Sequence, residues 1–340
     1  MKPTDFALNL TRYLSIYLPA KAGLSCNTIS SYRDMFKLLL AFYEEKLKIK
    51  PERLCLINFR REPIEQYLEW LEQERYCSVA TRNVRLAALR AFARYLQREA
   101  PEFLKQWQDI LSIPLKKHHQ GTFDYLSLEA MRELLNKPNR TSAAGYRDTT
   151  LLSLMYDSAA RVQEICDLTI GNLRLETPAT IKLIGKGNKS RVVPLMDNMA
   201  KLLYKYLHEH PAICGKLASH PLFPNRSGMK MTREGVAYLL DKYVGRVRVE
   251  GKVNMPEKVT PHCFRHSKAM HMLQAGVNLV YIRDILGHVD IKTTEIYARV
   301  DGEMKRKALE NNTNLVDKSM PLWQGDKPLL DWLKGFGKRI

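Results

Sequence analysis

Apolar residues recur at helical spacing through most of the first 110 positions. Over 25–43 they fall three and four residues apart, which predicts a long amphipathic helix. A second helix is expected over 64–73, because Pro63 suits a first helical turn. A third is expected from a cap at Thr81 to about Arg98. The apolar face of this third helix consists of Leu86, Leu89, Ala93 and Leu96.

The pattern changes in the segment SIPLKKHHQGT, which interrupts the helical spacing and contains Pro, Gly and Lys. We interpret 113–122 as a linker. Beyond it, Ser127 precedes a short helix, and an apolar helical run covers 146–157. Two β-rich segments, Thr180–Ile184 and Arg191–Leu195, flank GKGNKS as the strands of a hairpin would. The predicted fold is therefore mainly α with a small antiparallel β-sheet.

Two domains are expected, one helical over 1–112 and one α-rich with the small sheet over 123–311. The remaining tail, 312–340, offers a possible amphipathic helix at Pro328–Phe336. A chain of 340 residues, 45% of them apolar, is of a size that divides into two cores. Neither a membrane helix of roughly 20 apolar residues nor a signal peptide is evident. We expect a cytoplasmic protein with no membrane partner.

The net charge of the chain indicates a class of binding partner. The chain has 54 Lys and Arg against 36 Asp and Glu, a net charge of +18. Residues 1–120 carry +7 and the rest +11, so both expected domains are basic. This distribution is typical of a protein that grips a polyanion along its length, and it favours nucleic acid. In the third helix Arg90, Arg94 and Arg98 stack at every fourth residue, either as a solvated face or as a row of phosphate contacts.

Cysteines and histidines give little support to a disulfide or metal protein. The six cysteines are scattered without a C-x-x-C pair, so we expect reduced thiols. Among the nine histidines, His262 and His266 stand four residues apart, but no H-E-x-x-H motif or third ligand at suitable spacing accompanies them. We therefore expect no metal.

Two candidate chemical segments lie in the first half of the second domain. In SAARVQEICDL, Arg161 and Glu164 lie three residues apart near a helix start. In GKGNKS, glycines on either side of Lys186 allow a sharp turn with that lysine at its tip, and Lys189 belongs to the same turn. Each is a weak signal alone, because arginines near helix starts and lysines in turns are common.

A third segment combines a helix start with cationic side chains. Thr260 and Pro261 are typical of a helix N-cap and first turn, and HCFRHSKAMHML follows. His262 and Arg265 share one face at the N-terminal end of this helix. Because a helix N-terminus already favours anions, this arrangement predicts a phosphate pocket.

The fourth segment, LGHVDIKTTEIYARV, supplies a candidate nucleophile. Gly287 is expected to end one helix, with His288 in the turn that follows. Tyr297 lies on the next short helix, which Thr293 or Thr294 is expected to cap.

Together these segments resemble the tyrosine recombinase/integrase family. Its pattern is an Arg in R-x-x-E, a Lys in a β-hairpin turn, H-x-x-R, then L-G-H and a Tyr nine residues later, and all occur here in that order. The resemblance covers about 123–300, and the helical N-terminal part is similar to the family's core-binding domain. One departure is Ala159, since many members have glycine two residues before the first Arg; only a slight change of loop geometry is expected.

The resemblance implies one metal-independent site for phosphodiester transfer, formed by Arg161, Lys186, His262, Arg265, His288 and Tyr297. The two arginines would hold the non-bridging oxygens, Lys186 would protonate the leaving 5′-oxygen, and His262 would act as general acid/base. His288 would donate a further hydrogen bond, and Tyr297 would form a 3′-phosphotyrosyl link. No cofactor is implied. The implied partners are a double-stranded DNA recombination site, held in a two-domain clamp, and protomers of the same chain in a tetramer on two sites.

Alternatives remain open at this stage. A non-catalytic DNA-binding regulator would keep the fold without the chemistry, and a relaxing topoisomerase shares the Arg, Lys, His and Tyr set. Tyr281, Tyr156 and Tyr243 are rival nucleophiles, which we interpret as core residues. Because the helical part begins close to Met1, a Xer- or transposon-type recombinase is favoured over an arm-binding phage integrase.

Overall fold

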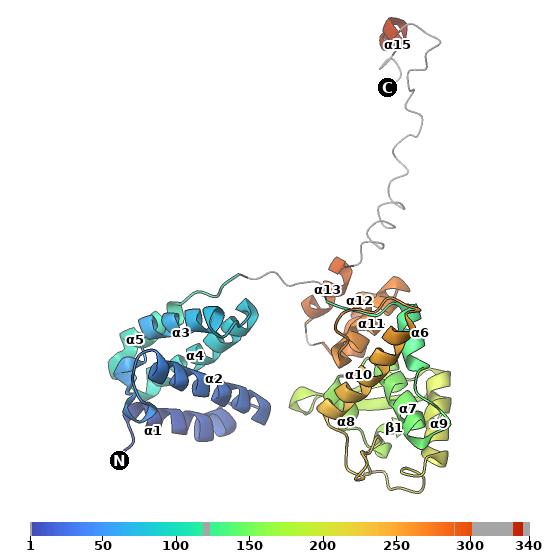
Figure 1. Cartoon of the computed structure of the whole chain (residues 1–340), viewed down its shortest axis with the longest axis horizontal. Helices are drawn as coiled ribbons and strands as arrows, with labels where there is room; N and C mark the ends of the chain where they lie inside the picture. Colours follow the sequence, from blue (N-terminus) through green and yellow to red (C-terminus); the bar gives the residue numbers. More distant parts are fainter. Residues whose placement is uncertain (1, 118–122, 289, 301–328, 336–340) are drawn as a thin grey trace. The chain divides into compact units, whose positions relative to one another are not determined.

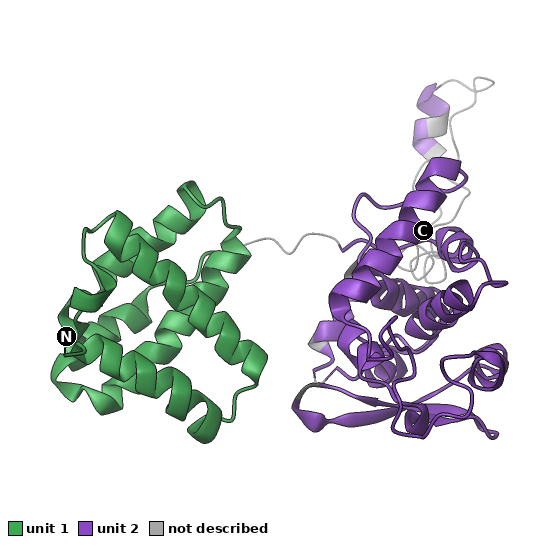
Figure 2. Ribbon diagram, turned by 60° about the horizontal axis from the view of Figure 1, so that its bottom comes forward, with its two compact units in different colours: residues 1–121 green, residues 122–340 purple. Residues whose placement is uncertain are grey.

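The computed structural model describes residues 2–117, 123–288, 290–300 and 329–335. The chain divides into two compact units, residues 1–121 and 122–340 (Figure 2). Its described residues form mainly helices and one small antiparallel sheet, as the hydrophobic pattern predicts (Figure 1). Within the described ranges, no helix combines the length and apolar character needed to cross a membrane.

Unit 1 is built from helices packed around an aromatic and aliphatic core. The face predicted for its longest helix is correct, because all four of its apolar residues are fully buried. Trp107 is also fully buried and donates its ring N–H to the carbonyl of Ala100 at 2.9 Å. The elements are α1 (Asp5–Arg12), the π-helix η1 (Tyr13–Lys21), α2 (Cys26–Glu45), the 3-10 turns η2 (Pro51–Arg53) and η3 (Leu56–Asn58), α3 (Arg61–Gln73), α4 (Val79–Glu99), η4 (Pro101–Phe103) and α5 (Leu104–Ser112).

Two predicted helix starts in unit 1 are too late. Thr81 does not cap α4; its backbone N–H donates to the hydroxyl of Ser78 at 3.2 Å, so this helix begins a turn earlier. Ser78 is as good a capping residue as Thr81, and spacing alone did not separate them. Likewise α3 begins at Arg61, which places Pro63 inside its first turn.

The first residues of the expected linker pack against α4. Ile113 is buried, Arg82 donates to the carbonyl of Pro114 at 3.1 Å, and Asn83 donates to that of Lys116 at 2.8 Å. The lack of helical periodicity here reflects irregular backbone that is nonetheless held by side-chain donors.

Unit 2 contains the sheet and the remaining described helices. Its elements are α6 (Leu128–Leu135), α7 (Ala143–Asp157), α8 (Val162–Cys166), η5 (Ile170–Asn172), β1 (Leu173–Arg174), β2 (Thr180–Ile184), η6 (Lys186–Asn188), β3 (Ser190–Pro194), α9 (Asp197–Glu209), α10 (Arg233–Glu250), α11 (Pro261–Gln274), α12 (Leu279–Leu286), α13 (Lys292–Val300) and α15 (Leu329–Gly335).

The predicted hairpin is present, and a short strand extends it. The strands lie antiparallel in the order β1-β2-β3, with Leu183 opposite Arg191 and Ile181 opposite Val193. The hairpin turn is tight because Gly187 has a φ of +73°, in the left-handed region that favours glycine. The two-residue β1 was not predicted, since so short a strand leaves no alternation to detect.

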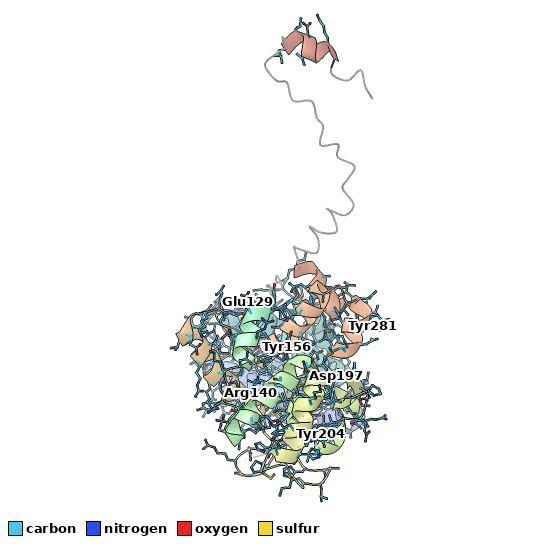
Figure 3. The ribbon with its side chains drawn as sticks, turned by 90° about the vertical axis from the view of Figure 1, so that its right-hand side faces the viewer. Glu129, Arg140, Tyr156, Asp197, Tyr204 and Tyr281 are labelled. Carbon is cyan, nitrogen blue, oxygen red and sulfur yellow. The ribbon has the colours of Figure 1, made fainter. Side chains whose placement is uncertain are left out.

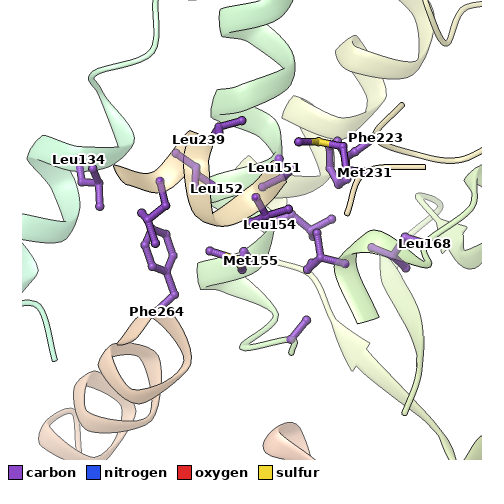
Figure 4. Close-up of a cluster of buried hydrophobic side chains, with 14 of the residues drawn as sticks. Leu134, Leu151, Leu152, Leu154, Met155, Leu168, Phe223, Met231, Leu239 and Phe264 are labelled. Carbon is purple, nitrogen blue, oxygen red and sulfur yellow. The ribbon is translucent and has the colours of Figure 1, made fainter. Parts of the chain in front are cut away.

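Among the described residues of unit 2, two apolar clusters form the core. The larger one gathers leucines of α7 with Phe264 of α11 and Leu239 of α10 (Figure 4). The smaller one lies among α11, α12 and α13 and includes Ala159, Ile282 and Tyr297. These three helices contact one another, so the segments that carry H-x-x-R, L-G-H and the tyrosine are packed together.

The last two helices differ in detail from their predictions. α13 begins at Lys292, so Thr293 and Thr294 lie inside its first turn rather than capping it; the carbonyl of Ile291 accepts the N–H of Thr294 at 2.7 Å. α15 covers 329–335, close to the helix expected at the tail. The predicted end of the second domain near 311 lies outside the described residues.

Candidate active site

Arg161 and Glu164 are joined twice at the start of α8. Arg161 is the N-cap residue, and its backbone N–H and its guanidinium donate to the two carboxylate oxygens of Glu164 at 2.8 and 2.9 Å. Glu164 is buried, whereas the Arg161 side chain is 38% exposed. The R-x-x-E spacing therefore fixes the base of the arginine side chain and leaves the rest of it accessible.

Arg191 completes this pair and was missed by sequence reasoning. From β3 it donates to both oxygens of Glu164 at 2.8 Å, and its Nε donates to the carbonyl of Ile285 at 2.9 Å. A signal was present, because Arg191 shares the inward face of its strand with Val193. A charged residue on an inward face indicates a buried partner.

Four hydrogen bonds hold Glu164 in its charged form. Burial alone would raise the pKa of this carboxyl group, but the hydrogen bonds from Arg191 and Arg161 outweigh burial and hold the pKa below its usual range. Glu164 thus joins α8 to the hairpin, and Arg191 extends this connection to the carbonyl of Ile285 in α12.

Two physical reasons explain why the L-G-H segment has a glycine at position 287. Gly287 ends α12 with a φ of +63°, as predicted for a helix stop. A Cβ at this position would also lie 2.8 Å from Cδ of Arg191, closer than real Cβ atoms approach other atoms. The glycine is therefore needed for Arg191 to reach Glu164.

Arg265 is anchored from the first turns of α11. Its side chain is buried and donates to the carbonyl of Ala159 at 2.9 Å and to that of Leu286 at 2.5 Å. Ala159 adopts a φ of +49°, which explains why glycine suits this position; alanine accepts the left-handed conformation at a cost of roughly 1 kcal/mol. Burial, followed by Arg161 and Arg191, lowers the pKa of Arg265 to about 9, so the guanidinium stays charged at neutral pH.

Three histidines face these cations and are neutral at neutral pH. Desolvation by the surrounding atoms, followed by Arg265, lowers the pKa of His262, whose side chain is still exposed, and of half-buried His288, the latter to about 4. Burial and then His262 lower the pKa of His266 to about 4 as well. His288 is also held by a 2.9 Å hydrogen bond between its Nδ1 and the hydroxyl of Thr294. The cations thus repel further positive charge. An uncompensated cluster of this kind favours the binding of an anion.

Tyr297 is buried beside this cluster, with 1% of its surface exposed. Its hydroxyl lies 3.0 Å from Nδ1 of His266, and its ring meets that of Phe123 edge to face at 5.1 Å. Burial raises the pKa of Tyr297 to about 12, although Arg265 and Arg161 act in the opposite direction. The sequence suggested for His266 only a role as a metal ligand, which its spacing does not support.

A pocket of about 620 Å³ opens beside these groups, lined by Arg161, Gly185, Lys189, Ser190, Arg191, Gly287, His288, Asp290 and Thr293. Lys189 is exposed at its edge. The backbone of Lys186 lies at the start of η6 in the same hairpin, while its side chain lies outside the described part of the chain. The structure therefore brings Arg161, His288 and the hairpin turn to one pocket.

The rival tyrosines have different surroundings. Tyr243 is buried and donates its hydroxyl to Asp148 at 2.8 Å, and the hydroxyl of half-buried Tyr156 pairs with His271. Tyr281 is 67% exposed, so its interpretation as a core residue is wrong (Figure 3). The buried face of α12 is formed by Ile282 and Leu286, and Tyr281 lies on another face of the helix.

The three arginines predicted on α4 do not form one uniform row. Arg94 and Arg98 are exposed, but Arg90 is half-buried and donates to the carbonyl of Ile113. Arg98 donates to the hydroxyl of Tyr17 at 2.7 Å and lies over its ring. The side chain of Arg90 thus binds within unit 1, because a carbonyl of the irregular backbone after α5 accepts its hydrogen bond.

The neutral histidines predict a pH dependence of stability. Because the folded pKa values of His266 and His288 lie near 4, below the ordinary value near 6.5, the unfolded chain binds more protons between these limits. The free energy of unfolding should therefore fall as the pH is lowered from about 6.5 towards 4. Urea titrations across this range should show the loss of free energy of unfolding. In the double variant His266→Gln and His288→Gln, this free energy should depend less on pH. Equal slopes would contradict these pKa values.

The comparisons with known proteins agree with this geometry. Residues 124–304 match the phage integrase family, and residues 10–100 match the phage integrase N-terminal SAM-like domain. The chain belongs to the phage integrase family of tyrosine recombinases. It is 34% identical over 295 residues to a putative integrase/recombinase, y4rC, of Sinorhizobium fredii, covering 87% of this chain and 88% of that protein. It is 31% identical to the tyrosine recombinase XerD of Staphylococcus haemolyticus, covering 84% and 91%.

Solved structures of this recombinase family share the fold. XerH site-specific recombinase in a post-cleavage complex with a palindromic difH substrate has a TM-score of 0.65 at 23% identity, covering 83% of this chain and 79% of that one. The Tn1549 transposon integrase in complex with transposon right end DNA also has a TM-score of 0.65, at 15% identity, covering 89% and 98%. At these identities the likeness concerns the fold, mainly helical with a small sheet.

Proposed function

We propose that this recombinase cleaves and rejoins DNA at specific sites through a 3′-phosphotyrosyl intermediate formed by Tyr297. The observation that carries the proposal is the cluster of Arg161, Arg265 and three neutral histidines beside this tyrosine, with Glu164 bound to Arg161. Family membership supports a DNA strand-transfer enzyme, and the geometry favours this nucleophile over the other tyrosines discussed.

Each side chain has a role that its surroundings suit. A phosphodiester resists attack because its oxygens are negative and the leaving alkoxide is poor. Arg161 and Arg265 would hold the non-bridging oxygens, and their charge would stabilise a pentacoordinate transition state. By family resemblance Lys186 protonates the leaving 5′-oxygen, and His262 acts as general acid/base. His288 would donate to the phosphate. We propose no metal, because cationic side chains supply the charge.

The proposed substrate is double-stranded DNA, gripped by both units as a clamp and recombined by four protomers on two sites. The net charge of +18 supports a polyanion partner. XerH is solved bound to a difH substrate, Tn1549 integrase in complex with transposon right end DNA, and a lambda integrase dimer bound to a core site. Arg94, Arg98 and Lys189 are exposed and are the phosphate contacts we favour; Arg90 is the weaker candidate.

Covalent trapping tests this function against its two alternatives. The DNA cleaved in cells that express the protein is mapped first, and a labelled duplex with that site is nicked so that cleavage releases a short strand and prevents rejoining. A recombinase should give a denaturant-resistant protein–DNA band on this duplex and little on a scrambled one. Binding without any band would favour the regulator, and relaxation of supercoiled DNA regardless of site would favour the topoisomerase.

The tail offers a prediction about assembly. Leu329, Leu330 and Leu333 of α15 are at least half exposed, and burying each is worth ~1.5–3 kcal/mol. If α15 docks on a neighbouring protomer, truncation after Asn314 should preserve binding to one site but remove cooperative assembly and regulated cleavage. Native mass measurement of the DNA complexes checks this. An unchanged tetramer fraction, with a lower melting temperature, would instead indicate docking on its own unit.

A further inference from the structure

The tyrosine of the candidate site is paired with a histidine that the family pattern does not include. Nδ1 of His266 lies 3.0 Å from the hydroxyl of Tyr297. Phe123 covers this pair, with its ring 4.7 Å from the imidazole and 5.1 Å from the phenol. The hydrogen bond is thus formed away from bulk water, where it is stronger than at a surface.

The protonation states of the pair are complementary. With a pKa near 12, Tyr297 keeps its proton at neutral pH, and with a pKa near 4, His266 is a neutral imidazole. A neutral imidazole has one ring nitrogen with a free lone pair. With that lone pair on Nδ1, the phenol donates and His266 accepts.

The proposed reaction requires this proton to leave. A phenol is a poor nucleophile until its proton is removed, and a positioned acceptor must lie within hydrogen-bonding distance of it. His266 meets this condition. His262, the family's acid/base residue, lies on the same helix with its ring 6.4 Å from that of His266.

We propose that His266 accepts the proton of Tyr297 as the tyrosine oxygen attacks phosphorus, an inference that rests on the proposed function. The bond from Oη to phosphorus forms, the bond from phosphorus to the 5′-oxygen breaks with its electron pair on that oxygen, and the phenolic proton passes to Nδ1. The 5′-oxygen takes a separate proton from the acid of the proposed mechanism. Rejoining reverses these steps, and His266 returns the proton.

The bound phosphate makes the transfer easier. In the free protein burial and the positive charge of Arg265 oppose a positive charge on His266. A phosphodiester held between Arg161 and Arg265 brings a negative charge next to them, so the imidazolium becomes less unfavourable when substrate is in place. The proton acceptor is thus strengthened by the substrate itself.

A substitution with a matched control tests this role. His266→Gln keeps a polar side chain but cannot take a proton. His271→Gln is the control, because His271 lies on the same helix and pairs through Nδ1 with the hydroxyl of Tyr156 at 2.8 Å. On the nicked duplex, His266→Gln should form the covalent band at least ~100-fold more slowly at equal DNA binding. His271→Gln should remain within a few-fold of the parent.

A chemical rescue separates proton transfer from structural support. Replacing Tyr297 with 3,5-difluorotyrosine gives a more acidic phenol, which depends less on an acceptor. In the His266→Gln protein this replacement should recover ~10-fold or more of the lost rate, well beyond its effect in the parent.

Three results would overturn the proposal for His266. The first is a His266→Gln cleavage rate within threefold of the parent, and the second is a loss of rate that difluorotyrosine does not restore. The third is faster cleavage, which would mean that the hydrogen bond keeps the tyrosine from attacking. If the parent itself forms no covalent band on the mapped site, the proposed function fails instead.

Discussion

Replacing Tyr297 with phenylalanine should abolish the covalent protein–DNA band while binding to the DNA site persists. The substitution removes one buried hydroxyl and its hydrogen bond to His266, at a cost of about 1 kcal/mol in the free energy of unfolding. The ring, which is 1% exposed and packs against Phe123, keeps its place. Loss of cleavage would therefore reflect the missing nucleophile rather than a damaged fold. A denaturing gel with the labelled nicked duplex measures the band, and a gel-shift assay measures binding.

Tyr281→Phe is the matched control. This tyrosine lies on the neighbouring helix α12 and is 67% exposed, so removal of its hydroxyl should leave both band and binding at the parent level. An undiminished band from Tyr297→Phe would exclude Tyr297 as the nucleophile. A band lost only from Tyr281→Phe would transfer the role to that residue.

The fold was largely predictable because its local signals agree with one another. The long helices carry continuous apolar faces, and Ser25, Ser127 and Gly287 stand where the structure begins or ends a helix. The hairpin was predictable because two β-rich segments flank a turn with glycines. What failed was the choice between equivalent caps, as at Ser78 and Thr81, where hydrogen bonds rather than residue type decide the start.

The sequence predicts the candidate site as a set of residues but not as a network of contacts. Family spacing makes Arg161 and Arg265 candidates, yet nothing in the spacing shows that Arg191 shares Glu164 with Arg161. The pairing of His266 with Tyr297 joins residues 31 positions apart, and only the packing of α11 against α13 brings them together. The eight residues of α12 are also too few for their apolar pattern to define the buried face, so the sequence wrongly predicted Tyr281 to be a core residue.

Arg161→Ala should lower the rate of cleavage by ~10²-fold or more, as expected for loss of a preorganised charge donor. Of the two arginines proposed to hold the phosphate, Arg161 gives the clearer test, because its side chain is 38% exposed. Arg265→Ala should cause a loss of the same order, but it also leaves the carbonyls of Ala159 and Leu286 without this donor. The melting temperature must therefore be measured beside the rate. Arg161→Lys adds a test of geometry, since lysine keeps the charge without the planar fork.

Arg191→Ala is the contrasting variant, because Arg191 and Arg161 bind the same carboxylate. The Glu164 side chain is only 3% exposed, and losing two of its four hydrogen bonds should cost ~3–5 kcal/mol in the free energy of unfolding, as for other broken buried ion pairs. Arg161→Ala leaves the two bonds from Arg191 in place, so its main effect should fall on the rate. If Arg161→Ala changes the rate by no more than a few-fold, or if a chelator slows the parent enzyme, the proposed role of the arginines as the charge that replaces a metal is wrong.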